Sequence, residues 1–156
     1  MYKIIDAKKT KNEDIIKRIL KYKNVNYKIA LAKNPNIKSK VMLELLNLNN
    51  SSITVALASN NHITSDVAEK LYSTGDFYTL ESLSKNESCP GFILDKLKIN
   101  DSFFIFLAEN KSTPTSTLEY ILNAKKDEDY CYEYLIDAVN KRDDVKQVIV
   151  TRKLNY

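Results

Sequence analysis

The sequence predicts an all-α protein, specifically a right-handed α-solenoid of short helix pairs that recur every 24–26 residues. Three observations predict this fold. The 156 residues include only two glycines and three prolines, too few for the many tight turns of an all-β sandwich or barrel. A pattern of apolar, small and asparagine positions repeats along the chain. The second half of each repeat has apolar residues at spacings of three, four and seven, which is typical of an amphipathic helix.

Four segments, which begin at residues 30, 56, 82 and 106, align in columns. The first apolar column is Leu31, Leu57, Leu83 and Leu107, and the small column beside it is Ala32, Ala58, Ser84 and Ala108. The polar column is Asn34, Asn60, Asn86 and Asn110. Two further columns are Val41, Val67, Ile93 and Thr117, and then Leu45, Leu71, Leu97 and Ile121. A helix pair of this size buries its apolar stripe only against a neighbouring copy, so the copies are expected to stack.

These columns divide one expected domain, residues 1–156, into copies. A degenerate first copy covers 1–22, repeats cover 23–48, 49–74, 75–99 and 100–124, and capping helices cover 125–156. Subtracting 26 from the column positions places apolar residues at Ile5, Ile15, Ile16 and Ile19 of the first copy, with Asp6 in the small column. Polar, degenerate terminal copies are typical of solenoids, because the ends of the stack face water.

Each repeat is expected to contain a short helix, an asparagine turn and a longer helix. The short helix is predicted over Asn26–Lys33 in one copy and Ser52–Ser59 in the next, each followed by an asparagine suited to a left-handed helix end. In the fourth repeat Thr113 is predicted to cap the longer helix and Pro114 to occupy its first position, where the missing N–H costs nothing.

The columns resemble the leucine-rich repeat variant family of bacterial α-solenoids. The resemblance is carried by Ala32-Lys33-Asn34-Pro35 and by Ala108-Glu109-Asn110 with Pro114, and it covers about residues 5–122. The period here is mostly 26 residues, and Asn-Pro is intact only once. The resemblance implies short stacked helices, some of them 3₁₀, in a curved superhelix similar to HEAT or armadillo arrays. It implies no catalytic residues.

Composition predicts a cytoplasmic protein. No apolar run approaches the ~20 residues of a membrane-spanning helix, so no membrane partner is expected. Met1–Thr10 shows no secretory signal, and two cysteines do not make a disulfide framework, which favours a reducing compartment.

The sequence predicts no enzyme, cofactor or metal site. His62 is the single histidine and falls in an asparagine turn, where an exposed structural role is expected. Cys89 and Cys131 are expected in the core. With only Gly75 and Gly91, a glycine-rich phosphate loop is excluded. An acidic cluster is expected to be solvated at a helix start; it consists of Asp127, Glu128, Asp129 and Glu133.

Charge divides the chain unevenly. Residues 1–40 contain 12 basic and 3 acidic residues, a balance of +9, and residues 41–156 contain 12 basic and 17 acidic residues, a balance of −5. The candidate anion or nucleic-acid site is Lys8, Lys9, Lys11, Lys17, Arg18, Lys21 and Lys23, with an ordinary solvated surface as the alternative. Candidate partner-binding residues are Glu69, Asp95, Glu119, Tyr130 and Tyr134, with a solvated face or the core as the alternative.

Two functions follow from these patterns. The leading hypothesis is a non-catalytic module that binds another protein or copies of itself, because the repeat is present and no catalytic constellation is. The alternative is nucleic-acid backbone binding through the lysine-rich N-terminal region. With three arginines in the whole chain, such contact is expected mainly with phosphates.

Overall fold

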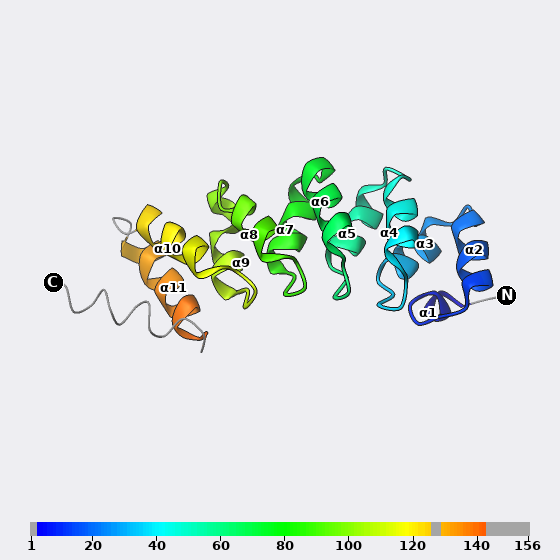
Figure 1. Cartoon of the computed structure of the whole chain (residues 1–156), viewed down its shortest axis with the longest axis horizontal. Coiled ribbons are helices and arrows are strands. Elements are labelled where there is room, and N and C mark those ends of the chain that lie inside the picture. The colour runs from blue at the N-terminus through cyan, green and yellow to red at the C-terminus, as the bar shows by residue number, and fades with distance from the viewer. Residues whose placement is uncertain (1–2, 126–128, 143–156) are drawn as a thin grey trace. The chain divides into compact units, whose positions relative to one another are not determined.

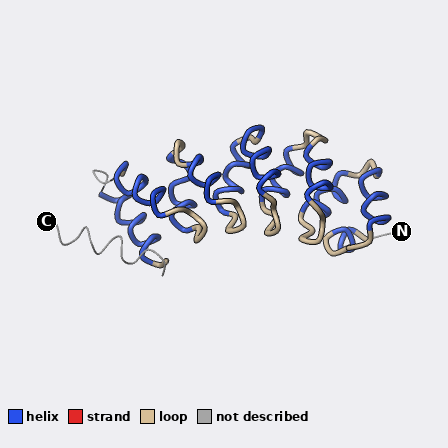
Figure 2. The backbone as a smooth tube through the Cα atoms, viewed as in Figure 1, coloured by secondary structure: helices blue, strands red, loops and turns tan. Residues whose placement is uncertain are grey.

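The computed structural model describes residues 3–125 and 129–142. Within these residues the chain forms eleven α-helices, one short 3₁₀ helix and no strand, so the all-α prediction is confirmed (Figure 2). The chain divides into two compact units, Met1–Pro90 and Gly91–Tyr156. The prediction of a single domain stays a prediction.

The first unit contains seven helices that follow the repeat (Figure 1). They are α1 (Ile4–Ala7), α2 (Glu13–Lys21), α3 (Val25–Ala32), α4 (Ser39–Leu46), α5 (Ser51–Ala58), α6 (Ser65–Thr74) and α7 (Phe77–Lys85). The odd-numbered helices contact one another in sequence, α1 on α3, α3 on α5 and α5 on α7. The α4 and α6 helices also contact each other, and they pack against the odd-numbered helices α3, α5 and α7. Equivalent helices of successive copies therefore lie side by side in this unit.

The second unit carries the remaining elements: α8 (Gly91–Leu97), η1 (Asp101–Phe103), α9 (Phe104–Glu109), α10 (Thr115–Ala124) and α11 (Asp129–Asn140). The α9, α10 and α11 helices contact one another. The Thr117 hydroxyl of α10 donates to the Asp95 carboxylate of α8 at 2.5 Å, which joins these two helices directly.

The predicted columns form the core. The first leucine column and the later leucine and isoleucine column are buried throughout; their residues are Leu31, Leu57, Leu83 and Leu107, and Leu45, Leu71, Leu97 and Ile121. The small column is fully buried, at Ala32, Ala58, Ser84 and Ala108. Small side chains at this column let the helices approach closely, as the sequence predicted.

The asparagine column has a role that the sequence did not predict. Asn60 is buried, and its side-chain Nδ2 donates to the backbone carbonyls of Ala32 and Asn34 in the preceding copy, at 2.7 and 3.0 Å. Its Oδ1 accepts from the backbone N–H of His62, at 2.8 Å, and so shapes its own turn. Each of these asparagines thus satisfies polar backbone groups that stacking takes away from water.

The same arrangement recurs at other positions of the column. Asn34 donates to the carbonyls of Ala7 and Thr10, and Asn86 donates to those of Ala58 and Asn60. We call this series the asparagine ladder: Asn34, Asn60 and Asn86 of the first unit. Among the described non-glycine residues, only Asn49 has a positive φ, at 50°. The asparagines of the ladder do not adopt the left-handed conformation, so the expectation of left-handed helix ends at these positions is wrong.

In the second unit Arg142 supplies the comparable contact. Its guanidinium is buried and donates to the carbonyls of Asn110, Lys111 and Thr113, at 2.7, 3.0 and 3.1 Å. An arginine has five N–H donors, so one side chain satisfies three carbonyls of the preceding turn.

Helix starts and the first copy differ from the prediction. The short helices begin one residue earlier than expected, at Val25 and Ser51. Pro114 is the N-cap of α10, with an extended ψ of 145°, so Thr113 does not cap the helix. Local backbone geometry near a proline decides this, because proline fixes φ and leaves ψ open.

The first half of the first copy is offset by one residue from the predicted register, whereas Ile16 and Ile19 of its second half are buried as predicted. Ala7 is buried and supplies the carbonyl that Ala32 supplies one copy later, so Ala7 rather than Asp6 occupies the small column. Ile5 is 55% exposed instead of buried. The stretch between α1 and the α2 N-cap differs in length from its counterparts, which breaks the 26-residue spacing.

Candidate functional site, a basic groove between α2 and α4

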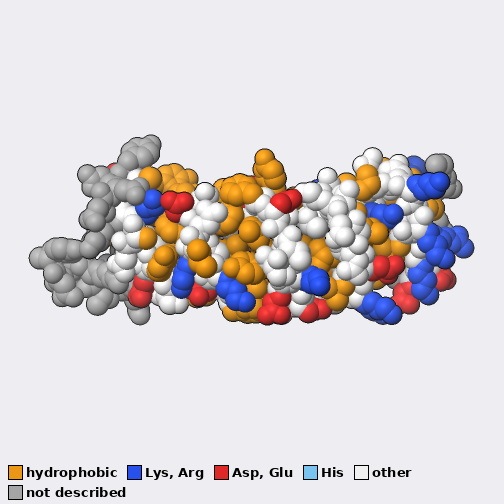
Figure 3. All heavy atoms as spheres, turned by 90° about the horizontal axis from the view of Figure 1, so that it is seen from above, with side chains coloured by type: hydrophobic (Ala, Val, Ile, Leu, Met, Phe, Trp, Pro, Cys, Tyr) orange, Lys and Arg blue, Asp and Glu red, His pale blue; other side chains and the backbone are white. Residues whose placement is uncertain are grey.

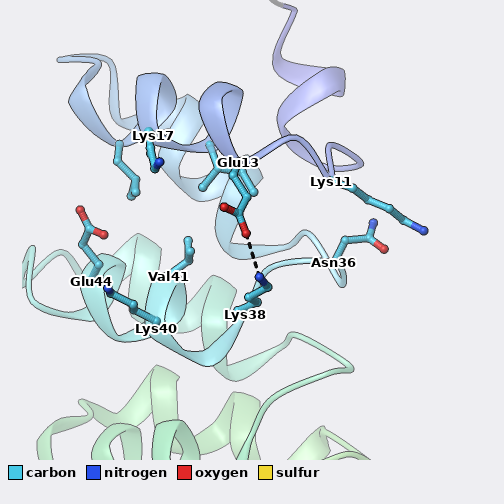
Figure 4. Close-up of a pocket in the computed structure, with 10 residues that line it drawn as sticks. Lys11, Glu13, Lys17, Asn36, Lys38, Lys40, Val41 and Glu44 are labelled. Carbon is cyan, nitrogen blue, oxygen red and sulfur yellow. Dashed lines mark hydrogen bonds and ion pairs between the residues drawn. The ribbon is translucent and has the colours of Figure 1, made fainter.

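The α2 and α4 helices of the first unit enclose a groove of about 390 Å³ (Figure 4). Its floor is apolar, made by the buried Ile16 and the half-buried Leu20 and Val41. Its rim is polar, and Asn36 lies at one end. The charged lining residues are Lys11, Lys17, Lys38, Lys40, Glu13 and Glu44. Four lysines and two glutamates give this groove a formal charge of +2.

The α2 helix presents one face to the groove. Glu13, Ile16, Lys17 and Leu20 lie at spacings of three, four and seven, so they share one side of the helix. The helix begins at a strong cap, because the side-chain Oδ1 of Asn12 accepts from the backbone N–H groups of residues 14 and 15, at 2.9 and 3.2 Å. This cap fixes where the face begins and therefore which side chains line the groove.

An ion pair joins the two walls of the groove. Lys38 stands at the N-cap of α4, and its Nζ lies 2.8 Å from Oε1 of Glu13 on α2. Figure 4 shows the two side chains pointing toward each other across the groove, and Lys11 extending away at one end. The side chains of Lys38 and Glu13 are 79% and 65% exposed, so salt screens the pair and it stabilises the fold little.

This pair shifts both ionisation equilibria. The hydrogen bond from Lys38, its charge and the charge of Lys17 lower the pKa of Glu13 below its ordinary value. The same hydrogen bond and the charge of Glu13 raise the pKa of Lys38. Both groups are therefore ionised at neutral pH, and the groove offers an ammonium group that is already held by a carboxylate.

The structure brings two of the seven predicted basic residues into this groove, Lys11 and Lys17. The other five are exposed and do not line it: Lys8, Lys9, Arg18, Lys21 and Lys23. Figure 3 shows lysine and arginine side chains gathered over the N-terminal helices, at the right of that view. The prediction missed Lys38 and Lys40, which come from the next copy. The separation of Glu13 and Lys38, 25 residues or about one repeat, was the available signal.

The predicted acidic column has mixed surroundings. Glu69 is exposed on α6 of the first unit. In the second unit Asp95 is half-buried and accepts from Lys98 at 2.7 Å and from Thr117 at 2.5 Å, and these hydrogen bonds lower its pKa. Glu119 is half-buried. Asp95 therefore links α8 to α10 through a side-chain hydrogen bond and has a structural contact.

The aromatic residues of the second unit differ in exposure. Phe103 and Phe104 are buried in the core of the second unit. Tyr134 on α11 is 51% exposed, which leaves it accessible to a partner. The side chain of Tyr130 lies outside the described residues.

The remaining reactive residues have structural surroundings. His62 is exposed, and its Nδ1 lies 3.0 Å from Oδ1 of Asn61. Cys89 is buried as predicted, and burial raises the pKa of its thiol to about 12. The core prediction for Cys131 is wrong, because this residue is exposed in the first turn of α11, before the buried face that begins at Leu135.

In the described part of the chain, no group of three or more histidine, cysteine or acidic residues is placed to hold a metal ion. Of the predicted acidic cluster, Glu133 is exposed on α11. Asp127, Glu128 and the side chain of Asp129 lie outside the described residues. None of the described helices has the length and apolar character required to cross a membrane.

Comparison with known proteins gives no relative for this chain: no family model, curated protein or solved structure matches it.

Proposed function

We propose that this chain is a non-catalytic helical-repeat protein that binds another protein, and that the α2–α4 groove is its contact surface. The single observation that carries the proposal is the combination of an apolar floor with a lysine-rich rim in one groove. Apolar side chains of a partner gain free energy by leaving water on such a floor, and lysines favour a partner with acidic residues.

A right-handed α-solenoid is the proposed arrangement of the repeats. It is supported by the contacts between equivalent helices of the first unit and by the asparagine ladder, which links one copy to the next. The columns continue in the sequence of the second unit, at Leu107, Asn110 and Ile121. Membership of the leucine-rich repeat variant family stays a prediction.

The alternative function is binding to a nucleic-acid backbone. It is favoured by the +9 charge balance of residues 1–40, where Lys21 and Lys23 are exposed outside the groove. The apolar floor of Ile16, Leu20 and Val41 would contribute little to binding a nucleic-acid backbone, because contacts with phosphates are electrostatic. We therefore favour a protein partner. A cytoplasmic location and the absence of a cofactor belong to the same proposal, and self-association is compatible with it.

The test compares two charge-reversal variants of the full chain with equal net charge. The groove variant carries Lys17→Glu and Lys40→Glu, and the control carries Lys21→Glu and Lys23→Glu. Each protein is immobilised, exposed to an extract of the source cells with or without nuclease, and washed. The bound proteins are identified, and each one is then purified and tested for direct binding to the wild type and to both variants.

We expect a nuclease-resistant partner that the wild type and the control retain and the groove variant loses. Separately, a 20-nucleotide single strand and a 20-base-pair duplex are titrated at several salt concentrations. Tight binding to these nucleic acids, weakened equally by both variants and falling steeply with salt, would replace our proposal with the alternative. Retention of the protein partner by the groove variant would show that the groove is not the contact surface.

A further inference from the structure

We propose that the α2–α4 groove recognises a short acidic peptide segment with apolar residues between its carboxylates, and that a carboxylate of this ligand displaces Glu13 from Lys38. This inference rests on the proposed function and gives the chemistry of the partner. The displacement makes Glu13 an internal competitor for the ligand.

The groove volume sets the size of the ligand. About 390 Å³ lies near the lower end of the roughly 300–1,000 Å³ typical of ligand pockets. The groove therefore accommodates a few side chains of an extended or helical segment, rather than the face of a folded domain.

The arrangement of charge and apolar surface sets the ligand's chemistry. Ile16, Leu20 and Val41 offer a floor for leucine-like side chains, while Lys17 on α2 and Lys40 on α4 flank that floor from opposite walls. A ligand that places carboxylates on both sides of an apolar residue satisfies both walls at once. A ligand with charge alone leaves the floor in water, and an apolar ligand makes no ionic contact with the lysines.

Lys38 connects the ligand to the ion pair. Its ammonium group is held by Glu13 across the groove at 2.8 Å, and both partners are mostly exposed. An exposed pair of this kind is weak and exchanges readily with another carboxylate. A bound peptide carboxylate therefore takes the place of Glu13 at Lys38, and the affinity of the groove depends on how strongly Glu13 competes.

The experiment uses three blocked synthetic peptides and the full chain. The parent peptide is Asp-Glu-Leu-Asp-Glu-Leu-Asp-Glu. One control replaces both leucines by serine, and the other replaces every acidic residue by its amide. Fluorescence anisotropy measures each dissociation constant at about 25 mM and about 150 mM salt. We expect the parent to bind best and each control to bind at least about ten-fold more weakly, because burial of a leucine and contact with lysines contribute separately.

Two protein variants test the displacement of Glu13. Glu13→Gln removes the competitor of Lys38, whereas Glu44→Gln removes an equal charge from the same groove and leaves the ion pair in place. We expect Glu13→Gln to bind the parent peptide about two- to five-fold more tightly than Glu44→Gln does, a range that matches the weak pairing of exposed ions. Circular dichroism establishes that both variants are folded.

Each outcome supports or overturns a defined statement. Equal affinities of the two variants would overturn the displacement of Glu13. Equal binding of the leucine and serine peptides, which carry the same charge, would overturn the role of the apolar floor. If none of the peptides binds while the groove variant still loses its protein partner, this inference fails and the proposed function stands. If the groove variant retains its protein partner, the groove is not the contact surface, and both the proposed function of the groove and this inference fail.

Discussion

Removing one amide of the asparagine ladder should destabilise the protein more than its size suggests. Asn60 is 2% exposed and makes three hydrogen bonds through its side chain, to the carbonyls of Ala32 and Asn34 and to the N–H of His62. Each such bond contributes about 0.5–1.5 kcal/mol net, and a buried group left unpaired costs about 1–3 kcal/mol. For Asn60→Ala we therefore expect a loss of about 3–4 kcal/mol in the free energy of unfolding.

The matched control is Asn61→Ala, one residue later in the same turn. Asn61 is exposed, and alanine removes only its exposed contact with Nδ1 of His62. The hydrogen bond that Asn61 receives from Ser88 goes to its backbone carbonyl, which alanine keeps. Surface changes of this kind stay within about 0.5 kcal/mol. Urea unfolding, monitored by circular dichroism at 222 nm, measures both variants against the wild type.

A third variant tests the direction of the hydrogen bonds. Asn60→Asp keeps the shape of the side chain but cannot donate to the carbonyls of Ala32 and Asn34 when ionised. At pH 7 we expect this variant to lose more stability than the alanine variant, because a buried charge faces two carbonyl oxygens. Below the pKa of the introduced carboxyl its O–H donates, and the loss should shrink. An alanine variant within 0.5 kcal/mol of the wild type would refute the ladder as a source of stability.

Three other expectations are independent of the ladder. Leu71→Asp should cost at least about 4 kcal/mol in urea unfolding, because Leu71 is fully buried and the new charge has no partner; an unchanged midpoint would contradict the column assignment. In a thiol-labelling assay at pH 8, the exposed Cys131 should react in the folded protein, whereas Cys89, which is buried and has a pKa of about 12, should react only on unfolding. Equal labelling rates for the two cysteines would contradict the burial of Cys89. Hydrogen bonds from the Ser51 hydroxyl, and then from the Thr79 N–H, lower the pKa of Asp76. The Asp76 carboxylate therefore stabilises the fold above the unfolded-state pKa of about 3.9, and this stabilisation is lost as pH falls through the lower folded-state pKa. Ser51→Ala should raise the pKa of Asp76 toward its ordinary value in a carboxyl NMR titration, and an unchanged pKa would show that the Ser51 contact is not its cause.

Helix type and core positions were readable from spacing alone. Within one longer helix, Val67, Ala68 and Leu71 lie at spacings of three and four, and all three are buried, because residues at these spacings share one helix face. The two short helices predicted to begin at Asn26 and Ser52 begin one residue earlier, at Val25 and Ser51. Local backbone geometry decides these features, and local geometry depends on neighbouring residues in the sequence.

Contacts between copies were not readable in this way. The recurrence of Asn60 marked a turn, but its carbonyl partners lie 26 and 28 residues earlier, and only the packing of one copy on the next brings them together. The groove likewise pairs Glu13 with Lys38 from the following copy, so a list of basic residues confined to the N-terminus missed half of its lysines. Side-chain partners across a stack depend on the offset between helices, and a change of one residue in loop length moves that offset without altering the periodicity of either helix.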